Sequence, residues 1–97
     1  MFRVRRQADS SAVQQSTIRF LSARLKALRE IARLTQEETA ELAGLTYKHY
    51  QTIEAGRKEE IWLSTVEKLA NAFGVGVWEL LAPTIPQPRM RKRVKSQ

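Results

Sequence analysis

Apolar residues recur every three or four positions along most of this chain, which is the spacing that one buried face of an α-helix requires. The first such run lies in residues 17–34 and comprises Phe20, Leu21, Leu25, Leu28, Ile31 and Ala32. A second lies in residues 65–73 and comprises Val66, Leu69, Ala70 and Phe73. Residues 75–82 form a shorter apolar run that Pro83 closes. No run alternates with the period of a strand, so the pattern predicts an all-α fold.

Between the first two runs, residues 35–56 predict two short helices joined by a tight turn. Thr35 and Glu38 have the spacing of a capping box, in which each side chain satisfies a free amide at the start of a helix. The helix would continue from Gln36 to about Ala43. Gly44 would end it, because glycine tolerates a left-handed backbone.

Thr46 is a second candidate N-cap, and the helix that it opens would end at Gly56. The small side chain of Ala40 allows these two helices to cross closely. Ser64 and Glu67 repeat the capping-box spacing, which predicts where the next helix begins. Together the segments give five helices in a chain of 97 residues.

The net charge of +7 is unevenly distributed along the chain. Residues 18–83 hold equal numbers of basic and acidic side chains, so the whole excess lies in the two ends. We therefore expect three parts: a polar and basic arm at 1–16, a folded domain at 17–83 whose first helix begins near Thr17, and a disordered basic tail at 84–97. The arm is either disordered or a looser backward extension of the first helix. The prolines at the start of that tail should hold its cationic half away from the domain.

Several function classes find no support in the composition. The chain has no cysteine, which excludes thiolate zinc sites and thiol nucleophiles. His49 is the single histidine and has no partners at metal-ligand spacing, so we expect no metal and no cofactor. No set of catalytic side chains emerges, and we expect no enzyme. No apolar run approaches the roughly 20 residues of a membrane span, and the first residues do not read as a secretion signal, so we expect a cytoplasmic protein.

The stretch RLKALREIARLTQEETAELAGLTYKHYQTIEAG closely resembles the Cro and phage-repressor, or xenobiotic-response-element-like, family of helix-turn-helix proteins. The similarity continues through STVEKLANAFGV and WELL, so that it covers roughly residues 18–82. The resemblance implies a compact bundle of five helices. It also implies a bacterial or phage regulator, such as a repressor, that binds double-stranded DNA in the nucleoid.

Members of that family place the N-terminal end of the second motif helix in the major groove. In this chain that helix is 46–55, and the positions that match the DNA-facing ones are Thr46, Tyr47, Lys48, Gln51 and Thr52. Lys48 suits the acceptors of guanine, Gln51 suits adenine, and a threonine methyl group suits thymine. The plainer reading is a solvated helix face with mixed polar residues.

A second set of residues is expected to contact phosphates. The candidates are Thr35, Gln36, Arg57 and Lys58, with Lys26 or Arg24 in support. Thr35 and Gln36 start a helix, where free amides and the helix dipole favour an anion, and the resemblance adds Gln36 as a phosphate clamp. Arg57 and Lys58 follow the reading helix, although they also fit an ordinary charged loop.

Two further pairs have structural roles by resemblance. Arg29 and Glu54 match an arginine and a glutamate that form a partly buried ion pair in the family. Trp78 and Leu81 lie on the last helix, which often forms a two-fold interface, so they are candidate contacts of a homodimer. We expect most of the apolar area of Trp62, Trp78 and their neighbours to be core.

This chain departs from the family pattern at Thr39, usually leucine, and at Tyr50, usually aliphatic. Two other functions stay open. Antitoxins have a similar fold and bind a toxin partner with their tails, and a non-specific DNA-coating protein would use the basic ends alone.

Overall fold

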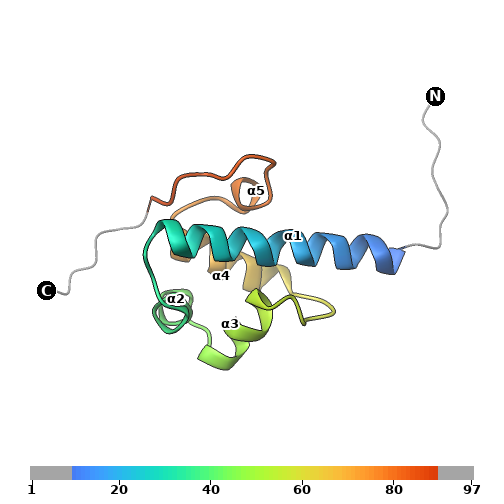
Figure 1. Ribbon diagram of the computed structural model, residues 1–97, viewed down its shortest axis with the longest axis horizontal. Helices are drawn as coiled ribbons and strands as arrows, with labels where there is room; N and C mark the ends of the chain where they lie inside the picture. The colour runs from blue at the N-terminus through green and yellow to red at the C-terminus, as the bar shows by residue number, and fades with distance from the viewer. Residues whose placement is uncertain (1–9, 90–97) are drawn as a thin grey trace, which may run out of the picture.

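The computed structural model describes residues 10–89, and the side chains from Gln15 onward. Its helices are α1 (Ser10–Ile31), α2 (Gln36–Ala43), α3 (Tyr47–Glu54), α4 (Leu63–Phe73) and α5 (Val77–Leu80). No strand is found in this part of the chain, so the predicted all-α fold with five helices is confirmed. In Figure 1, α2 and α3 lie on one side of the long α1, and α5 lies on the other.

The core forms where the apolar faces of the helices meet. Its fully buried side chains are Leu25, Leu28, Tyr50, Ile53, Leu69, Phe73 and Leu80, together with Thr39. The two departures from the family pattern are both accommodated by hydrogen bonds. The hydroxyl of Thr39 donates to the carbonyl of Thr35 at 2.9 Å, and that of Tyr50 donates to Glu54 at 3.2 Å. A buried hydroxyl needs such a partner, because leaving it unpaired costs free energy.

α1 begins at Ser10, seven residues before the expected start near Thr17. Residues 10–16 contain neither proline nor glycine, and their alanine and glutamines favour a helix once the following turns are formed. The predicted apolar stripe of α1 is only partly buried. Phe20 and Ile31 are 40% and 46% exposed, while Ile18 is buried although it was not predicted.

The start of α4 is not the predicted one. Its N-cap is Trp62, which provides no side-chain hydrogen bond, and Ser64 lies within the first turn. The amides of Thr65 and Val66 are satisfied instead by the carbonyl of Trp62. The predicted capping box at Ser64 is therefore wrong, because the spacing of Ser64 and Glu67 does not by itself determine at which residue the helix begins.

Two tryptophans are largely outside the core. Trp62 and Trp78 are each 75% exposed, contrary to the expectation that most of this apolar area is buried. Leu80 occupies the core position of α5 instead.

Arg24 is buried and holds α5 against α1. Its guanidinium donates to the carbonyls of Leu80 and Pro83 at 3.0 and 3.4 Å and lies 4.8 Å from the centre of the Phe20 ring. Carbonyls at a helix end lack intrahelical partners, and a cation is favoured there. The idea that Arg24 supports phosphate binding is therefore wrong, since its charge faces inward.

The segment after α5 folds back over the domain. The amide of Arg89 donates to the carbonyl of Phe73 at 2.8 Å, and its guanidinium contacts Glu79 at 2.7 Å. Arg89, the first basic residue of the tail, therefore does not stand away from the domain as the cationic half was expected to. The basic residues from Arg91 onward, and the arm at 1–9, lie outside the described residues.

Candidate nucleic-acid interface

The helix-turn-helix pair is fixed by local hydrogen bonds at each end. Thr35 Oγ1 accepts from the Glu38 amide at 3.0 Å, and Glu38 Oε1 accepts from the Thr35 amide at 2.9 Å, which completes the predicted capping box. Gly44 ends α2 with φ of 73°, in the left-handed region. Thr46 Oγ1 then accepts from the His49 amide at 3.0 Å and opens α3. These ends agree with the sequence prediction.

α3 turns one face inward and the other to solvent. Tyr50, Ile53 and Glu54 are buried. The outward positions include the five candidate reading residues, of which Thr46, Tyr47, Lys48 and Gln51 are exposed and Thr52 is half-buried. Four of the five candidates are therefore open to solvent, Thr46 at the N-terminal end of the helix and the others on the turns that follow.

Hydrogen bonds limit what each of these side chains can offer. Gln51 Nε2 donates to the hydroxyl of Tyr47 at 3.2 Å, so the two form a single polar unit. The hydroxyl of Thr52 donates to the carbonyl of Lys48 at 2.9 Å, and that of Thr46 is engaged in its cap. Both hydroxyls therefore already have a backbone partner, although that of Thr46 accepts only and keeps its proton to donate. The ammonium of Lys48 is exposed and has its three donors to offer.

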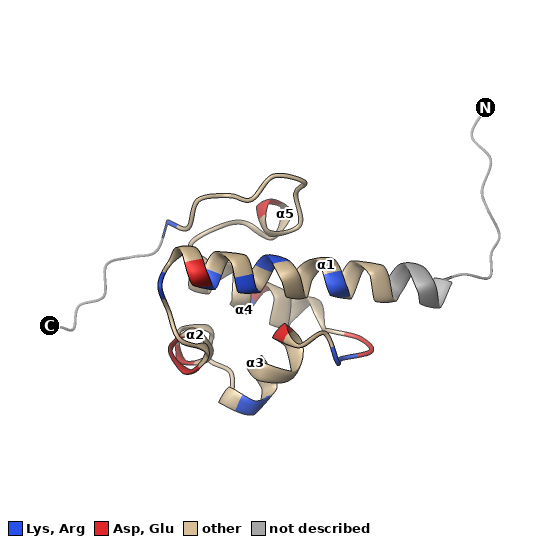
Figure 2. Ribbon diagram, in the orientation of Figure 1, with Lys and Arg blue, Asp and Glu red and all other residues tan. Residues whose placement is uncertain are grey.

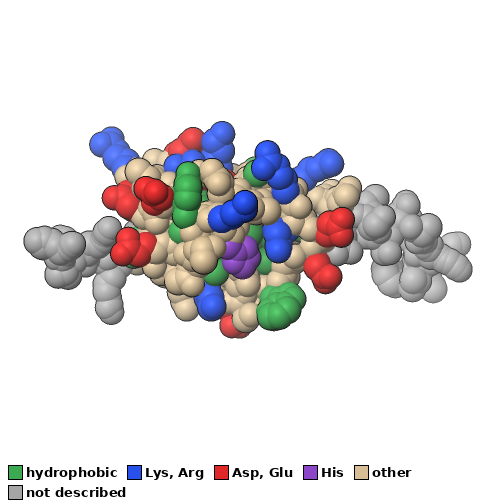
Figure 3. All heavy atoms as spheres, turned by 90° about the horizontal axis from the view of Figure 1, so that it is seen from below, with side chains coloured by type: hydrophobic (Ala, Val, Ile, Leu, Met, Phe, Trp, Pro, Cys, Tyr) green, Lys and Arg blue, Asp and Glu red, His purple; other side chains and the backbone are tan. Residues whose placement is uncertain are grey.

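Basic and acidic side chains occupy different parts of this face. Acidic side chains gather on α2, while the exposed start of α3 is basic (Figure 2). Seen from the α2 and α3 side, basic side chains occupy much of the middle and upper part of the face, and acidic ones lie toward its two ends (Figure 3). The sole histidine, His49, lies near the centre and is half-buried. In the sequence His49 has no partners at metal-ligand spacing, and its place on this face was not predicted.

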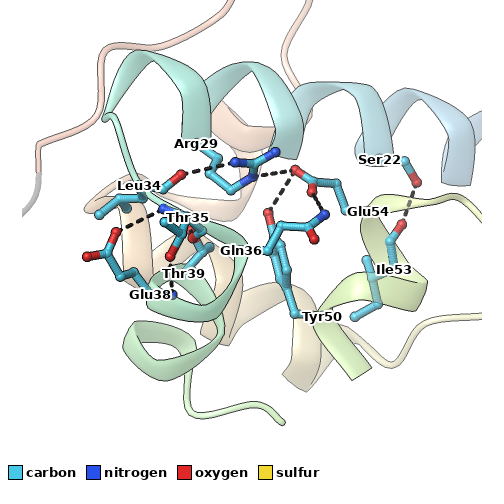
Figure 4. A network of polar contacts seen from close by, with 10 residues as sticks. All are labelled: Ser22, Arg29, Leu34, Thr35, Gln36, Glu38, Thr39, Tyr50, Ile53 and Glu54. Atoms are coloured by element: carbon cyan, nitrogen blue, oxygen red, sulfur yellow. Dashed lines mark hydrogen bonds and ion pairs between the residues drawn. The ribbon is translucent and has the colours of Figure 1, made fainter. Parts of the chain in front are cut away.

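A buried carboxylate joins three helices behind this face (Figure 4). Glu54, whose side chain is 3% exposed, accepts from Arg29 Nε of α1 at 2.8 Å and from the Tyr50 hydroxyl at 3.2 Å. The Gln36 side chain, at the start of α2, donates to the other oxygen of Glu54. Arg29 also donates to the carbonyl of Leu34 at 3.0 Å. The Arg29 and Glu54 pair is thus present where the resemblance placed it, with two partners that the sequence did not predict.

This arrangement shifts the acid–base behaviour of its members. The hydrogen bond from Glu54 raises the pKa of Arg29, against the opposing effect of burial. Burial, reinforced by the nearby charge of Glu54, raises the pKa of the Tyr50 hydroxyl well above its ordinary value. Both effects keep Arg29 charged and Tyr50 neutral, which is the combination that satisfies the carboxylate.

The phosphate candidates differ in how available they are. The backbone amide and the hydroxyl of Thr35 are both engaged in its capping box. The side-chain amide of Gln36 donates to Glu54. The first turn of α2 also carries Glu37 and Glu38, which oppose an anion nearby. Arg57 is exposed just after α3, and Lys58 is half-buried.

In the described part of the chain, no group of histidine, cysteine, aspartate or glutamate residues could hold a metal ion. Within the same residues, no helix has the length and apolarity needed to cross a membrane.

Comparison with known proteins agrees with this geometry. A family described as helix-turn-helix domain matches residues 21–82. The crystal structure of a hypothetical transcription factor, NHTF from Neisseria, is similar with a TM-score of 0.66 and 33% identity, over 72% of this chain and 79% of that one. An HTH_3 family transcriptional regulator from Vibrio cholerae shares the fold with a TM-score of 0.62 and 23% identity, over 66% of this chain and 35% of that one. No curated protein matches the sequence. The chain belongs to the helix-turn-helix domain family, as its resemblance to the Cro and phage-repressor proteins predicted.

Proposed function

We propose that this protein is a transcriptional regulator that binds double-stranded DNA in a sequence-specific manner. The observation that carries the proposal is the placement of α3: its buried face is fixed by Tyr50, Ile53 and Glu54, and its outer face presents exposed polar side chains. The similarity to a hypothetical transcription factor from Neisseria supports the same function. A rigid, exposed helix of this kind suits the major groove, whose width admits an α-helix.

Within this proposal, α3 enters the groove with its N-terminal end foremost. Lys48 has an exposed ammonium and reads the acceptors of guanine. Gln51 reads adenine, with Tyr47 fixing its amide through their hydrogen bond. Thr46 and Thr52 contribute methyl groups, which suit the methyl group of thymine.

Phosphate contacts would set the position of α3 without reading sequence. Arg57 and Lys58 are placed just beyond the end of α3 and reach the flanking backbone. Gln36 contributes its second amide hydrogen while the first stays on Glu54, so that a phosphate contact and the buried network share one side chain. Thr35 contributes mainly by placing the start of α2 through its capping box.

We further propose that the protein acts as a homodimer, with Trp78 and Leu81 near its two-fold axis. Both side chains are exposed, at 75% and 39%, and both are apolar. A two-fold dimer would present two copies of α3 about 34 Å apart and would read a nearly palindromic site.

Selection of bound DNA from a random library tests the reading residues. The full chain should enrich one motif, and Lys48→Ala and Gln51→Ala should each relax the motif at a different position. Lys68→Ala is a matched control, because Lys68 is an exposed lysine on α4 rather than on α3. It should leave the motif unchanged.

Two results would contradict the proposal. If both α3 variants retain the original motif, the reading residues are wrong. If the full chain prefers no sequence by more than about tenfold over bulk DNA, binding is the non-specific kind that phosphate contacts provide.

A further inference from the structure

Tyr47 and Gln51 lie one turn apart on α3, and both are open to solvent. The side chain of Gln51 is exposed, and Tyr47 is 44% exposed. Gln51 Nε2 donates a hydrogen bond to the Tyr47 hydroxyl at 3.2 Å. Residues four apart are neighbours on the surface of a helix, so this contact forms within α3 itself. α3 therefore presents the two side chains as a pair, with a defined arrangement of donors and acceptors.

The hydrogen bond to Tyr47 limits what the Gln51 amide can offer to a ligand. A glutamine side chain has two N–H donors and one carbonyl acceptor. Tyr47 takes one of the two amide hydrogens, which leaves one N–H and Oε1. The hydroxyl of Thr52, the next residue, donates to the carbonyl of Lys48 at 2.9 Å and so does not take up Oε1. Gln51 therefore offers one donor and one acceptor rather than two donors.

This combination of groups distinguishes the two purines in the major groove. Adenine presents the N7 acceptor and the N6 amino donor, which one N–H and one carbonyl oxygen match. Guanine presents two acceptors, N7 and O6, which call for two donors. With one amide hydrogen held by Tyr47, Gln51 would have to turn Oε1 toward a guanine acceptor. Two acceptors in contact leave both without a hydrogen, which is costly once water is excluded.

DNA itself would hold the amide of Gln51 in this orientation. The Tyr47 hydroxyl accepts from Gln51, so its own proton is left to donate. Tyr47 is the first residue of α3, at the end that the proposed function places in the groove, and phosphates flank that groove. A phosphate diester accepts hydrogen bonds and donates none. A hydroxyl that donates to a phosphate cannot also donate to Oε1, so the amide must keep its nitrogen toward Tyr47.

We infer that Tyr47 is a specificity-determining residue that acts through Gln51. By occupying one amide hydrogen, it makes Gln51 select adenine against guanine. The inference rests on the proposed reading role of α3 and specifies how one side chain of that helix discriminates between bases. Tyr47 then controls the choice of a base without touching it, while its phosphate contact adds affinity that is independent of sequence.

Equilibrium binding of the full chain to two duplexes tests this inference. Both duplexes carry the selected motif, and they differ only by adenine or guanine at the position that Gln51→Ala relaxes. The wild type should prefer adenine, and Tyr47→Phe should reduce that preference about fivefold, because one hydrogen bond no longer restrains the amide. Loss of the phosphate contact weakens binding to both duplexes equally and leaves their ratio unchanged. Lys48→Ala keeps both members of the pair and should retain the adenine preference.

A double-mutant cycle tests whether Tyr47 acts through Gln51. In the Gln51→Ala background, Tyr47→Phe should not change the ratio of the two affinities, because the amide that it would release is absent. An adenine preference that survives Tyr47→Phe undiminished would overturn the inference, as would an equal change in both backgrounds. Either result leaves the reading role of Gln51 in place. If Gln51→Ala relaxes no position of the motif, the reading role itself is wrong, and the inference fails with it.

Discussion

Glu54 is the side chain on which the relative positions of α1, α2 and α3 depend. Its carboxylate accepts hydrogen bonds from Arg29, Gln36 and Tyr50, one from each of these helices. Glu54→Ala should lower the free energy of unfolding by about 3 kcal/mol, because it leaves the largely buried Arg29 without its counter-charge. Urea denaturation of the two proteins measures this difference.

The matched control for this prediction is Glu67→Ala, which removes an exposed carboxylate from α4. It should change the unfolding free energy by no more than about 0.5 kcal/mol, as is usual for exposed positions. Equal stability of Glu54→Ala and the wild type would mean that the buried network contributes nothing to the fold.

Tyr50 should make the protein sensitive to alkaline pH. Burial raises the pKa of its hydroxyl above the ordinary value of 10.0. Above about pH 10 the unfolded chain releases this proton while the folded chain retains it, so a rise in pH favours unfolding. The contribution is fully present below about pH 10 and should then decline by about 1.4 kcal/mol per pH unit.

Urea denaturation between about pH 9 and 11 measures this decline. Tyr50→Phe should lose some stability at neutral pH, about 1 kcal/mol for its hydrogen bond to Glu54, yet show a shallower decline in base. Tyr47→Phe alters the exposed tyrosine of the same helix and should decline as steeply as the wild type. A decline of equal steepness in both variants would show that another group controls alkaline unfolding.

The turn between α2 and α3 depends on the backbone of Gly44. Its φ of 73° is in the left-handed region, and a Cβ placed there would meet no atom within 4 Å. Gly44→Ala should therefore cost about 1 to 2 kcal/mol through backbone strain alone, without any steric clash. Gly44→Asn should cost less, since asparagine adopts this conformation more readily. Thermal denaturation would contradict this account if alanine were tolerated as well as asparagine.

Helix ends were predictable from sequence where a local hydrogen bond defines them. Thr35, Gly44 and Thr46 act within four residues of themselves, and all three mark the ends that the sequence indicated. The start of α4 was missed because Trp62 caps with its carbonyl alone, which leaves no signature in the side chains. The sequence left open whether α1 extends back into residues 10–16, because these residues permit a helix without requiring one.

Contacts between residues distant in the chain could not be predicted from the sequence, for a different reason. Arg24 reaches the carbonyl of Leu80, and Arg89 reaches that of Phe73, so each partner is a backbone group that every residue possesses. In the candidate interface, the helical period indicated which side of α3 faces outward. It could not reveal that the Gln36 amide is directed to Glu54, because that contact depends on how α2 and α3 cross.

At the scale of the whole molecule, opposite sides of α1 have different surfaces. α2 and α3 lie on one side, and α5 with the exposed Trp78 lies on the other (Figure 1). The contacts proposed with DNA and with a second copy of the chain therefore lie on different sides of α1 and do not compete. Arg89 is also held against the domain, by its hydrogen bond to the carbonyl of Phe73 and its ion pair with Glu79. The other basic residues of the C-terminal tail follow it in the sequence.

These basic residues should add electrostatic affinity without adding sequence preference. Beyond Arg89 the chain carries Arg91, Lys92, Arg93 and Lys95. If these cations neutralise four phosphates, replacing them with glutamine should reduce the slope of log affinity against log salt by about 3 to 4. Fluorescence anisotropy with one DNA duplex over a range of salt measures the slope, and Lys68→Gln on α4 should leave it nearly unchanged. The motif selected from a random library should also stay the same, because phosphates carry no base information. An unchanged slope would place these cations away from DNA, and an altered motif would mean that they reach the bases.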